Sequence, residues 1–145
     1  MSRPYLRCLA ACLALGLLLA ACAGMSPAKM MRQNDNTLSD YGAAIRWNEF
    51  DAAQGFMDAA TLEEHSLTDL ERERFKQIQV TGYDVKHKLV APDGSIDQTV
   101  EIRLISRNTQ VERTVTDQQH WRWDAPTRRF LLTSGLPDFS NTNIP

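Results

Sequence analysis

The chain has 145 residues, of which 43% are hydrophobic and 23% are charged, and these are the proportions of an ordinary globular domain. They exclude a disordered chain, a collagen-like or coiled-coil protein and a protein with several membrane spans. The formal charge of −2 provides no basic excess to neutralise phosphates, so we expect no nucleic-acid partner.

The N-terminus has the layout of a bacterial export signal. Arg3 and Arg7 precede a run of apolar and small residues over 8–23 that is rich in leucine and alanine. This run of 16 residues is short for a membrane-spanning helix, which needs about 20 residues. We therefore expect residues 1–21 to be a signal peptide.

The apolar run ends in Leu19-Ala20-Ala21-Cys22, which resembles the lipobox of bacterial lipoproteins. The resemblance implies cleavage between Ala21 and Cys22, a diacylglycerol on the Cys22 thiol and a further acyl chain, such as palmitate, on the new amine. Ala23 stands where an aspartate retains such proteins at the inner membrane of enteric-type bacteria, which implies the outer membrane. The alternatives are an uncleaved N-terminal anchor and an ordinary signal followed by a coincidental cysteine.

The other cysteines, Cys8 and Cys12, lie within the expected signal. The mature domain would then contain no free thiol and no disulfide, so its core alone must hold it in an oxidising periplasm. Cysteine catalysis and thiolate metal sites are excluded on the same count. The sequence has no pair of histidines with metal spacing, no glycine-rich phosphate loop and no nucleophile elbow, so we expect no metal and no cofactor.

The rest of the chain divides into three segments. Residues 22–37 hold the lipidated cysteine and a polar stretch without an apolar period, which we interpret as a tether. Residues 38–138 would form the domain, and residues 139–145 a C-terminal tail. A tether of this length would let the domain lie just off the membrane.

Two helices are expected at the start of the domain. Apolar residues at steps of three, four and seven predict one long helix over Leu38–Ala60, with Trp47, Phe50 and Met57 widening its apolar face. Thr68-Asp69-Leu70-Glu71 then matches a capping box, which predicts a short helix that ends near Phe75.

From Ile78 onward apolar and polar residues alternate, which predicts strands. A break in the phase of this alternation at Gly82 predicts a bulge that bends the first strand. Turn residues at 92–95, 107–109 and 124–127 separate four sequential antiparallel strands. Helices followed by strands predict an α+β domain, with a long and a short helix packed on a curved four-stranded antiparallel sheet.

Two stretches carry a further resemblance. Residues 41–53, and Trp121 and Trp123 followed by residues 130–137, resemble small proteobacterial lipoproteins of unknown function with the nuclear-transport-factor-2-like fold. The resemblance implies a long helix in the concave face of the sheet and a cone-shaped cavity beneath it. The superfamily has a fuller set of three helices, whereas here the second and third are short or merged.

The third strand has an inner face that is apolar at both ends and polar at Arg113, Asp117 and Gln119. Buried polar groups need partners, so these residues either satisfy one another, with an Arg113–Asp117 pair, or line a wet cavity. Superfamily enzymes such as ketosteroid isomerase and scytalone dehydratase use an inward aspartate or histidine in that place. Tyr83 and His87 complete the candidate cavity lining, and no residue is assigned as catalytic.

The sequence therefore predicts a lipoprotein, not an enzyme, that is anchored in the outer membrane through Cys22 and faces the periplasm. It would act as a small binding or scaffolding module for an envelope protein or a small hydrophobic ligand. One alternative is an enzyme or ligand binder that uses the sheet cavity, with Asp117 or His87 as a base. Another is a homodimer through the polar sheet face. The polar row of this face is Glu112, Thr114, Thr116, Gln118 and His120.

Overall fold

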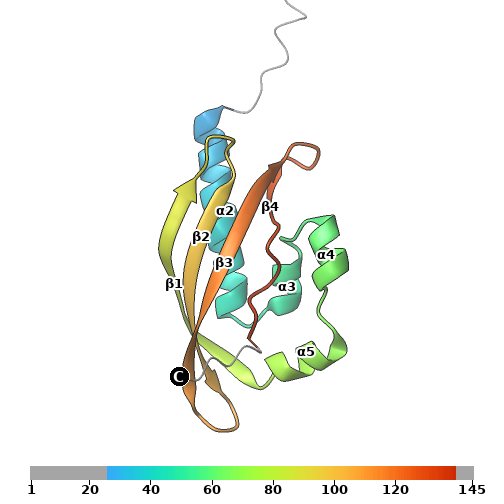
Figure 1. Cartoon of the computed structure of the whole chain (residues 1–145), viewed down its shortest axis with the longest axis vertical. Coiled ribbons are helices and arrows are strands. Elements are labelled where there is room, and N and C mark those ends of the chain that lie inside the picture. Colours follow the sequence, from blue (N-terminus) through green and yellow to red (C-terminus); the bar gives the residue numbers. More distant parts are fainter. Residues whose placement is uncertain (1–25, 140–145) are drawn as a thin grey trace, which may run out of the picture. The chain divides into compact units, whose positions relative to one another are not determined.

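A computed structural model describes residues 26–139 of the chain (Figure 1). Within these residues, four strands form one antiparallel sheet in the order β1-β2-β3-β4, and four helices precede it. The predicted α+β class and its four-stranded antiparallel sheet are thus confirmed. The elements are α2 (Pro27–Arg46), α3 (Phe50–Gln54), α4 (Ala59–His65), α5 (Asp69–Phe75), β1 (Ile78–Val90), β2 (Ile96–Ser106), β3 (Glu112–Asp124) and β4 (Arg129–Leu132).

The helix α2 begins earlier than the sequence predicts. It starts at Pro27 instead of Leu38, so the part of the expected tether that the structure describes is helical from residue 27 on. A proline is well suited to the first helical position, because the N–H that it lacks would have no partner within the helix. The carbonyl of Ser26 accepts hydrogen bonds from the backbone N–H groups of Lys29 and Met30. The chain divides into two compact units, of which the first ends at Arg32 and the second begins at Gln33. The packing described below concerns the second unit alone.

The expected long helix also ends early, at Arg46, and α3 and α4 follow as separate helices. Asn48 has a left-handed backbone with φ 61°, a conformation that asparagine tolerates better than most residues. Its side-chain amide donates to the carbonyl of Ile78 at 3.0 Å and accepts from the N–H of Val80 at 3.1 Å. The reversal of the chain is therefore fixed by contacts with β1.

One face of α2 packs against the sheet (Figure 1). Leu38, Tyr41 and Ile45 are buried, and the ring of Tyr41 meets the indole of Trp121 edge-on at 5.1 Å. Trp47 is 77% exposed, so the prediction that it widens the apolar face is wrong. It lies beyond the end of α2, where the helical period no longer applies.

The sheet confirms the predicted alternation and its first irregularity. Val100, Ile102 and Leu104 are fully buried on one face of β2. The pairing of β1 with β2 shifts by one residue between Val80 and Gly82, which is the predicted bulge. A second shift, between Val85 and His87, is not marked by a glycine.

Candidate functional site

The polar part of the inner face of β3 is a hydrogen-bonded cluster around the Gln119 side chain. Its Nε2 donates to Asp117 Oδ2 at 2.7 Å and to the Tyr83 hydroxyl at 2.9 Å. Its Oε1 accepts from Gln98 Nε2 at 3.1 Å and from Trp121 Nε1 at 3.2 Å. We call these five residues the Gln119 cluster. It lies under α2, because Tyr83 packs so close to Gly42 that a Cβ there would lie 2.9 Å from the tyrosine ring.

Burial governs the electrostatics of this cluster. Asp117 is only 8% exposed, and the loss of hydration raises its pKa to about 6, although the hydrogen bond from Gln119 acts in the opposite direction. Burial likewise raises the pKa of Tyr83 to about 12. The neighbouring Tyr41 hydroxyl is buried without a hydrogen-bond partner among the described residues, and its pKa is raised by burial and then by Asp117. The cluster thus favours uncharged groups.

The structure brings together three of the five predicted site residues, Tyr83, Asp117 and Gln119. The prediction for His87 is wrong. The second register shift in β1 inserts one residue, so His87 pairs with Thr99 on the outer face and is exposed. Sequence reasoning missed Gln98, although it stands in phase with the buried residues of β2 and so belongs to the inner face.

Arg113 is also absent from the cluster. Its guanidinium donates to the backbone carbonyl of Phe139, so the predicted Arg113–Asp117 pair does not form. The buried polar side chains of β3 do bond to one another, as one of the two interpretations expects, but the partner of Asp117 is Gln119 and not Arg113. Asp117 lines neither the larger cavity described next nor the shallow hollow of about 370 Å³ that Tyr83 and Gln98 share above Gly42.

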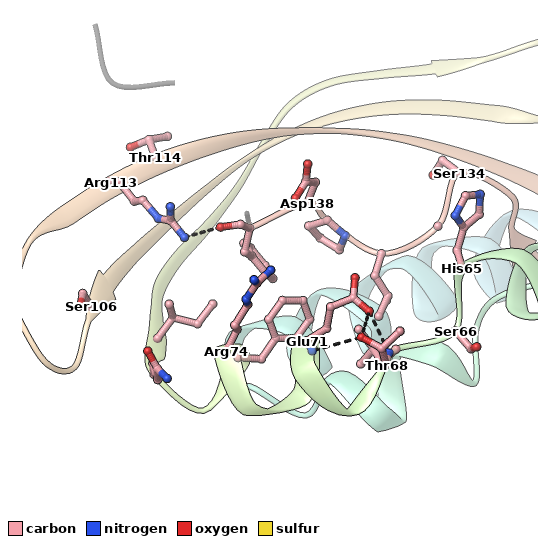
Figure 2. Close-up of a pocket in the computed structure, with 18 of the residues that line it drawn as sticks. His65, Ser66, Thr68, Glu71, Arg74, Ser106, Arg113, Thr114, Ser134 and Asp138 are labelled. Atoms are coloured by element: carbon pink, nitrogen blue, oxygen red, sulfur yellow. Dashed lines mark hydrogen bonds between the residues drawn. The ribbon is translucent and has the colours of Figure 1, made fainter. Parts of the chain in front are cut away.

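The larger cavity, which Arg113 lines and Asp117 does not, has a volume of about 1130 Å³ (Figure 2). Most of its wall comes from α5 with the loop before it, from the N-terminal end of β3 with its preceding turn, and from residues 134–139, which we call the strap. The end of α4, the start of β1 and the end of β2 complete the wall. The apolar lining residues are Leu67, Phe75, Ile78, Val111, Leu136, Pro137 and Phe139. The acidic and basic lining residues are Glu64, Glu71, Arg74, Glu112, Arg113 and Asp138, and His65 also lines the cavity. We call this space the strap cavity.

The strap is fixed at its far end by aromatic packing. Phe139 is 4% exposed, and the centroid of its ring lies 5.4 Å from the ring centroid of Phe50 and 5.3 Å from that of Phe75. The hydrogen bond from the Arg113 guanidinium to the Phe139 carbonyl, drawn as a dashed line in Figure 2, adds a second attachment. Phe139 was predicted to begin the tail. A lone aromatic residue after Pro137 in an otherwise polar segment was the only sequence signal for this anchor.

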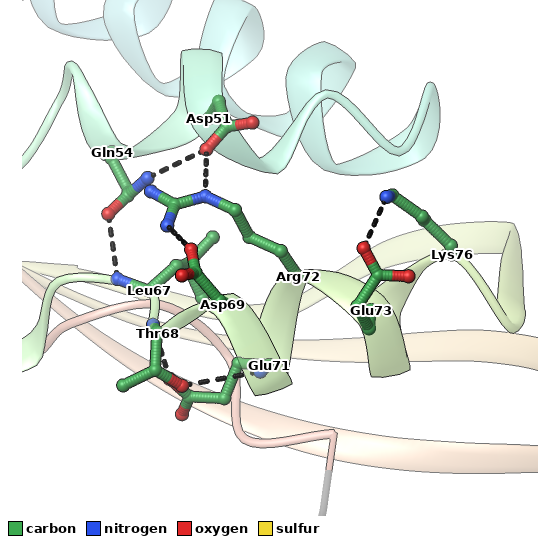
Figure 3. Close-up of polar contacts among 9 residues, drawn as sticks. All are labelled: Asp51, Gln54, Leu67, Thr68, Asp69, Glu71, Arg72, Glu73 and Lys76. Carbon is green, nitrogen blue, oxygen red and sulfur yellow. Dashed lines mark hydrogen bonds and ion pairs between the residues drawn. The ribbon is translucent and has the colours of Figure 1, made fainter.

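The α5 wall of the cavity is held by side-chain caps and ion pairs (Figure 3). The predicted capping box is confirmed: Thr68 Oγ1 accepts from the Glu71 N–H at 3.2 Å, and Glu71 Oε2 accepts from the Thr68 N–H at 2.8 Å. The carboxylate of Glu71 accepts hydrogen bonds from both the N–H and the hydroxyl of Thr68, and these two bonds lower its pKa. Arg72 donates to Asp51 at 3.0 Å, which ties α5 to α3.

Replacing Thr68 by alanine is expected to lower the free energy of unfolding by about 1 kcal/mol, because the first turn of α5 loses its side-chain acceptor. Urea unfolding followed by circular dichroism measures this change. Ser66→Ala is the matched control, since the Ser66 side chain makes no hydrogen bond within residues 26–139. An equal loss in both variants would contradict a specific capping effect.

The sites that the sequence assigns to lipidation lie outside the described residues, because Ala21 and Cys22 precede residue 26. Within residues 26–139, no helix is long and apolar enough to cross a membrane. In the same part of the chain, no three His, Cys, Asp or Glu side chains gather as metal ligands would. No protein-family model, curated protein sequence or solved structure matches the chain.

Proposed function

We propose that the chain is a lipid-anchored protein of the bacterial envelope, held in the outer membrane through Cys22, whose periplasmic domain binds a partner. The anchor is supported by Arg3 and Arg7, by the apolar run that follows and by the residues Leu19-Ala20-Ala21-Cys22. Because each buried CH₂ contributes about 0.8 kcal/mol, several acyl chains would hold the protein in the membrane durably.

The strap cavity is the single observation that carries the binding role. Its volume of about 1130 Å³ is comparable with that of ligand-binding pockets, which range over roughly 300–1,000 Å³. Its floor includes the aromatic side chains of Phe75 and Phe139, and carboxylates and guanidinium groups stand around it. An apolar floor with polar groups at the margin suits a ligand or partner segment with an apolar body.

We also propose that the domain is a nuclear-transport-factor-2-like fold with a reduced helical part. The packing of α2 on a bent four-stranded antiparallel sheet supports this assignment. The short helices α3, α4 and α5 depart from the superfamily pattern. The space beneath α2 is filled by Tyr41 and Trp121, both fully buried, where the superfamily has its cavity.

That filling removes the main support for the enzyme alternative. Tyr83 and Asp117 meet through Gln119, but His87 lies on the opposite face of the sheet. The dimer alternative gains no support either, because outer-face side chains bond to one another. These pairs are Thr99–Gln118 at 2.8 Å, Lys86–Glu101 at 2.8 Å, Arg103–Asp84 at 3.2 Å and His120–Asp97 at 2.6 Å.

The anchor is tested by Cys22→Ala in the full-length chain expressed in a Gram-negative host. We expect complete loss of label from an alkyne analogue of palmitate, because the only thiol that the lipobox presents is gone. Gel fluorescence of the labelled protein measures the outcome, and separation of inner and outer membranes locates the wild-type protein.

Cys12→Ala is the matched control, since it removes a cysteine from the same N-terminal segment and should leave labelling intact. Label that persists in Cys22→Ala, or that is lost equally in Cys12→Ala, would contradict the assignment of Cys22. Wild-type protein in the inner membrane would contradict the outer-membrane location.

A further inference from the structure

The strand β3 has one edge that is only partly covered. On one side it pairs with β2 from Glu112 to Trp121 without a shift in register. On the other side β4 pairs only with residues 121–124, and Thr133 and Ser134 extend the contact to His120. Within residues 26–139, no strand pairs with this second edge between residues 112 and 118.

The direction of the backbone groups along this edge follows from His120. Its N–H donates to Ser134 Oγ at 3.2 Å, and its carbonyl accepts from the Thr133 N–H at 2.9 Å, so both groups face the β4 side. In an antiparallel strand the N–H and C=O of every second residue point to the same side. The backbone groups of Glu112, Thr114, Thr116 and Gln118 therefore point to the uncovered edge.

The strap cavity runs beside the first part of this edge. After Ser134 the chain leaves the sheet, and Glu112, Arg113 and Thr114 form the cavity wall opposite α5 and the strap. Figure 2 shows Thr114 and Arg113 on β3 across the cavity from Arg74 and Glu71 of α5. An open row of strand donors and acceptors is a template for another strand, and here it adjoins an apolar floor.

We propose that the strap cavity binds an extended segment of a partner polypeptide that carries basic side chains and adds as a strand to the free edge of β3. This identification rests on the proposed binding function and specifies its ligand. Backbone complementarity selects an extended peptide, because only another strand satisfies a row of alternating N–H and C=O groups. A partner strand of about six residues would span the roughly 20 Å from residue 112 to residue 118.

The charge of the cavity selects the side chains of that segment. The charged lining includes four carboxylates, from Glu64, Glu71, Glu112 and Asp138, and two guanidinium groups, from Arg74 and Arg113. The lining thus carries more negative than positive charge, which favours lysine or arginine in the ligand. Val111 is 62% exposed at the cavity wall, so it offers an apolar contact to every second side chain of the bound peptide.

The test uses the full-length lipoprotein in nonionic detergent micelles and a fluorescein-labelled octapeptide of alternating lysine and valine. Fluorescence anisotropy, corrected with protein-free micelles, measures the dissociation constant. Thr114→Pro is expected to weaken binding at least tenfold, because proline removes an N–H that faces the free edge and no bond to β2. Thr114→Ala keeps that N–H and should bind within twofold of the wild type.

Two methylated peptides test the same edge without changing the protein. In one the lysine nitrogens of the backbone are methylated, and in the other the valine nitrogens are methylated. In an extended peptide the lysine N–H groups point to one side and the valine N–H groups to the other, so only one of the two groups can face β3. One methylated peptide should therefore lose binding at least tenfold, and the other should not. A glutamate–valine octapeptide should bind at least tenfold more weakly than the lysine–valine peptide.

Unchanged binding by a folded Thr114→Pro variant would overturn the proposal, as would equal effects of the two methylated peptides. Light scattering of the same samples distinguishes a different occupant: a dimer that Thr114→Pro converts to a monomer would assign the edge to a second copy of this chain. Absence of peptide binding would refute the peptide ligand, whereas failure of the anchor would appear separately as loss of lipid label at Cys22.

Discussion

Replacing Gln119 by leucine is expected to lower the free energy of unfolding by about 4 kcal/mol. The leucine has a similar volume but no polar atom, so the buried Trp121 Nε1 and Gln98 Nε2 lose their acceptor and Asp117 loses its donor. Each buried polar group left without a partner costs about 1–3 kcal/mol. Urea unfolding at neutral pH, followed by tryptophan fluorescence, measures the change.

The adjacent residue provides a matched control. Gln118 lies on the outer face, where its side chain accepts from Thr99 at 2.8 Å and stays exposed to water. Gln118→Leu should therefore change the free energy of unfolding by no more than about 0.5 kcal/mol. Comparable losses in the two variants would show that the Gln119 cluster does not hold the sheet and α2 together.

The features that the sequence predicts correctly depend on neighbouring residues. Alternation over a few positions is enough to place Val100, Ile102 and Leu104 inside, and the capping box needs only Thr68 and Glu71. The bulge at Gly82 is signalled by the glycine itself. Such patterns determine the type of element and the face that it buries, and they suffice for the α+β class.

The features that the sequence analysis misses depend on contacts between distant segments. The helix break at Asn48 is fixed by bonds to Ile78 and Val80, which a helical period cannot anticipate. The second bulge of β1 carries no glycine, and the alternation of Val85, His87 and Leu89 continues unbroken in the sequence. His87 therefore stands in phase with Tyr83 in the sequence but lies on the other face of the sheet in the structure.

The candidate sites show the same division. Alternation along β3 correctly places Asp117 and Gln119 on one buried face. It cannot identify the partner of Arg113, because that partner is a backbone carbonyl, a group that every residue possesses. The strap cavity is formed by several segments far apart in the sequence, so no local motif marks it.

Asp117→Asn is expected to stabilise the protein at neutral pH by roughly 2.5 kcal/mol, relative to its effect at about pH 4. The carboxyl has a pKa of about 6 in the folded protein, raised from 3.8 because burial removes its hydration. The folded protein thus holds this proton more tightly than the unfolded chain. The stability that Asp117 contributes is fully present below about pH 4 and is lost as the pH rises through about 6.

Urea unfolding of both proteins between about pH 4 and pH 7 tests this dependence. The free energy of unfolding of the asparagine variant, minus that of the wild type, should rise with pH and level off above about pH 7. Other carboxyls are common to both proteins and cancel in this difference, including Asp58 and Glu71, whose hydrogen bonds lower their pKa values.

Asp124→Asn provides a control of opposite sign. Hydrogen bonds from Thr127 lower the pKa of Asp124, so its carboxylate stabilises the folded state as the pH rises. The corresponding difference for Asp124→Asn should therefore fall with pH. A flat curve for Asp117→Asn would mean that water reaches its carboxylate, and that result would revive the wet cavity beneath α2 as a binding site, because a hydrated Asp117 requires an opening that the packed Gln119 cluster does not provide.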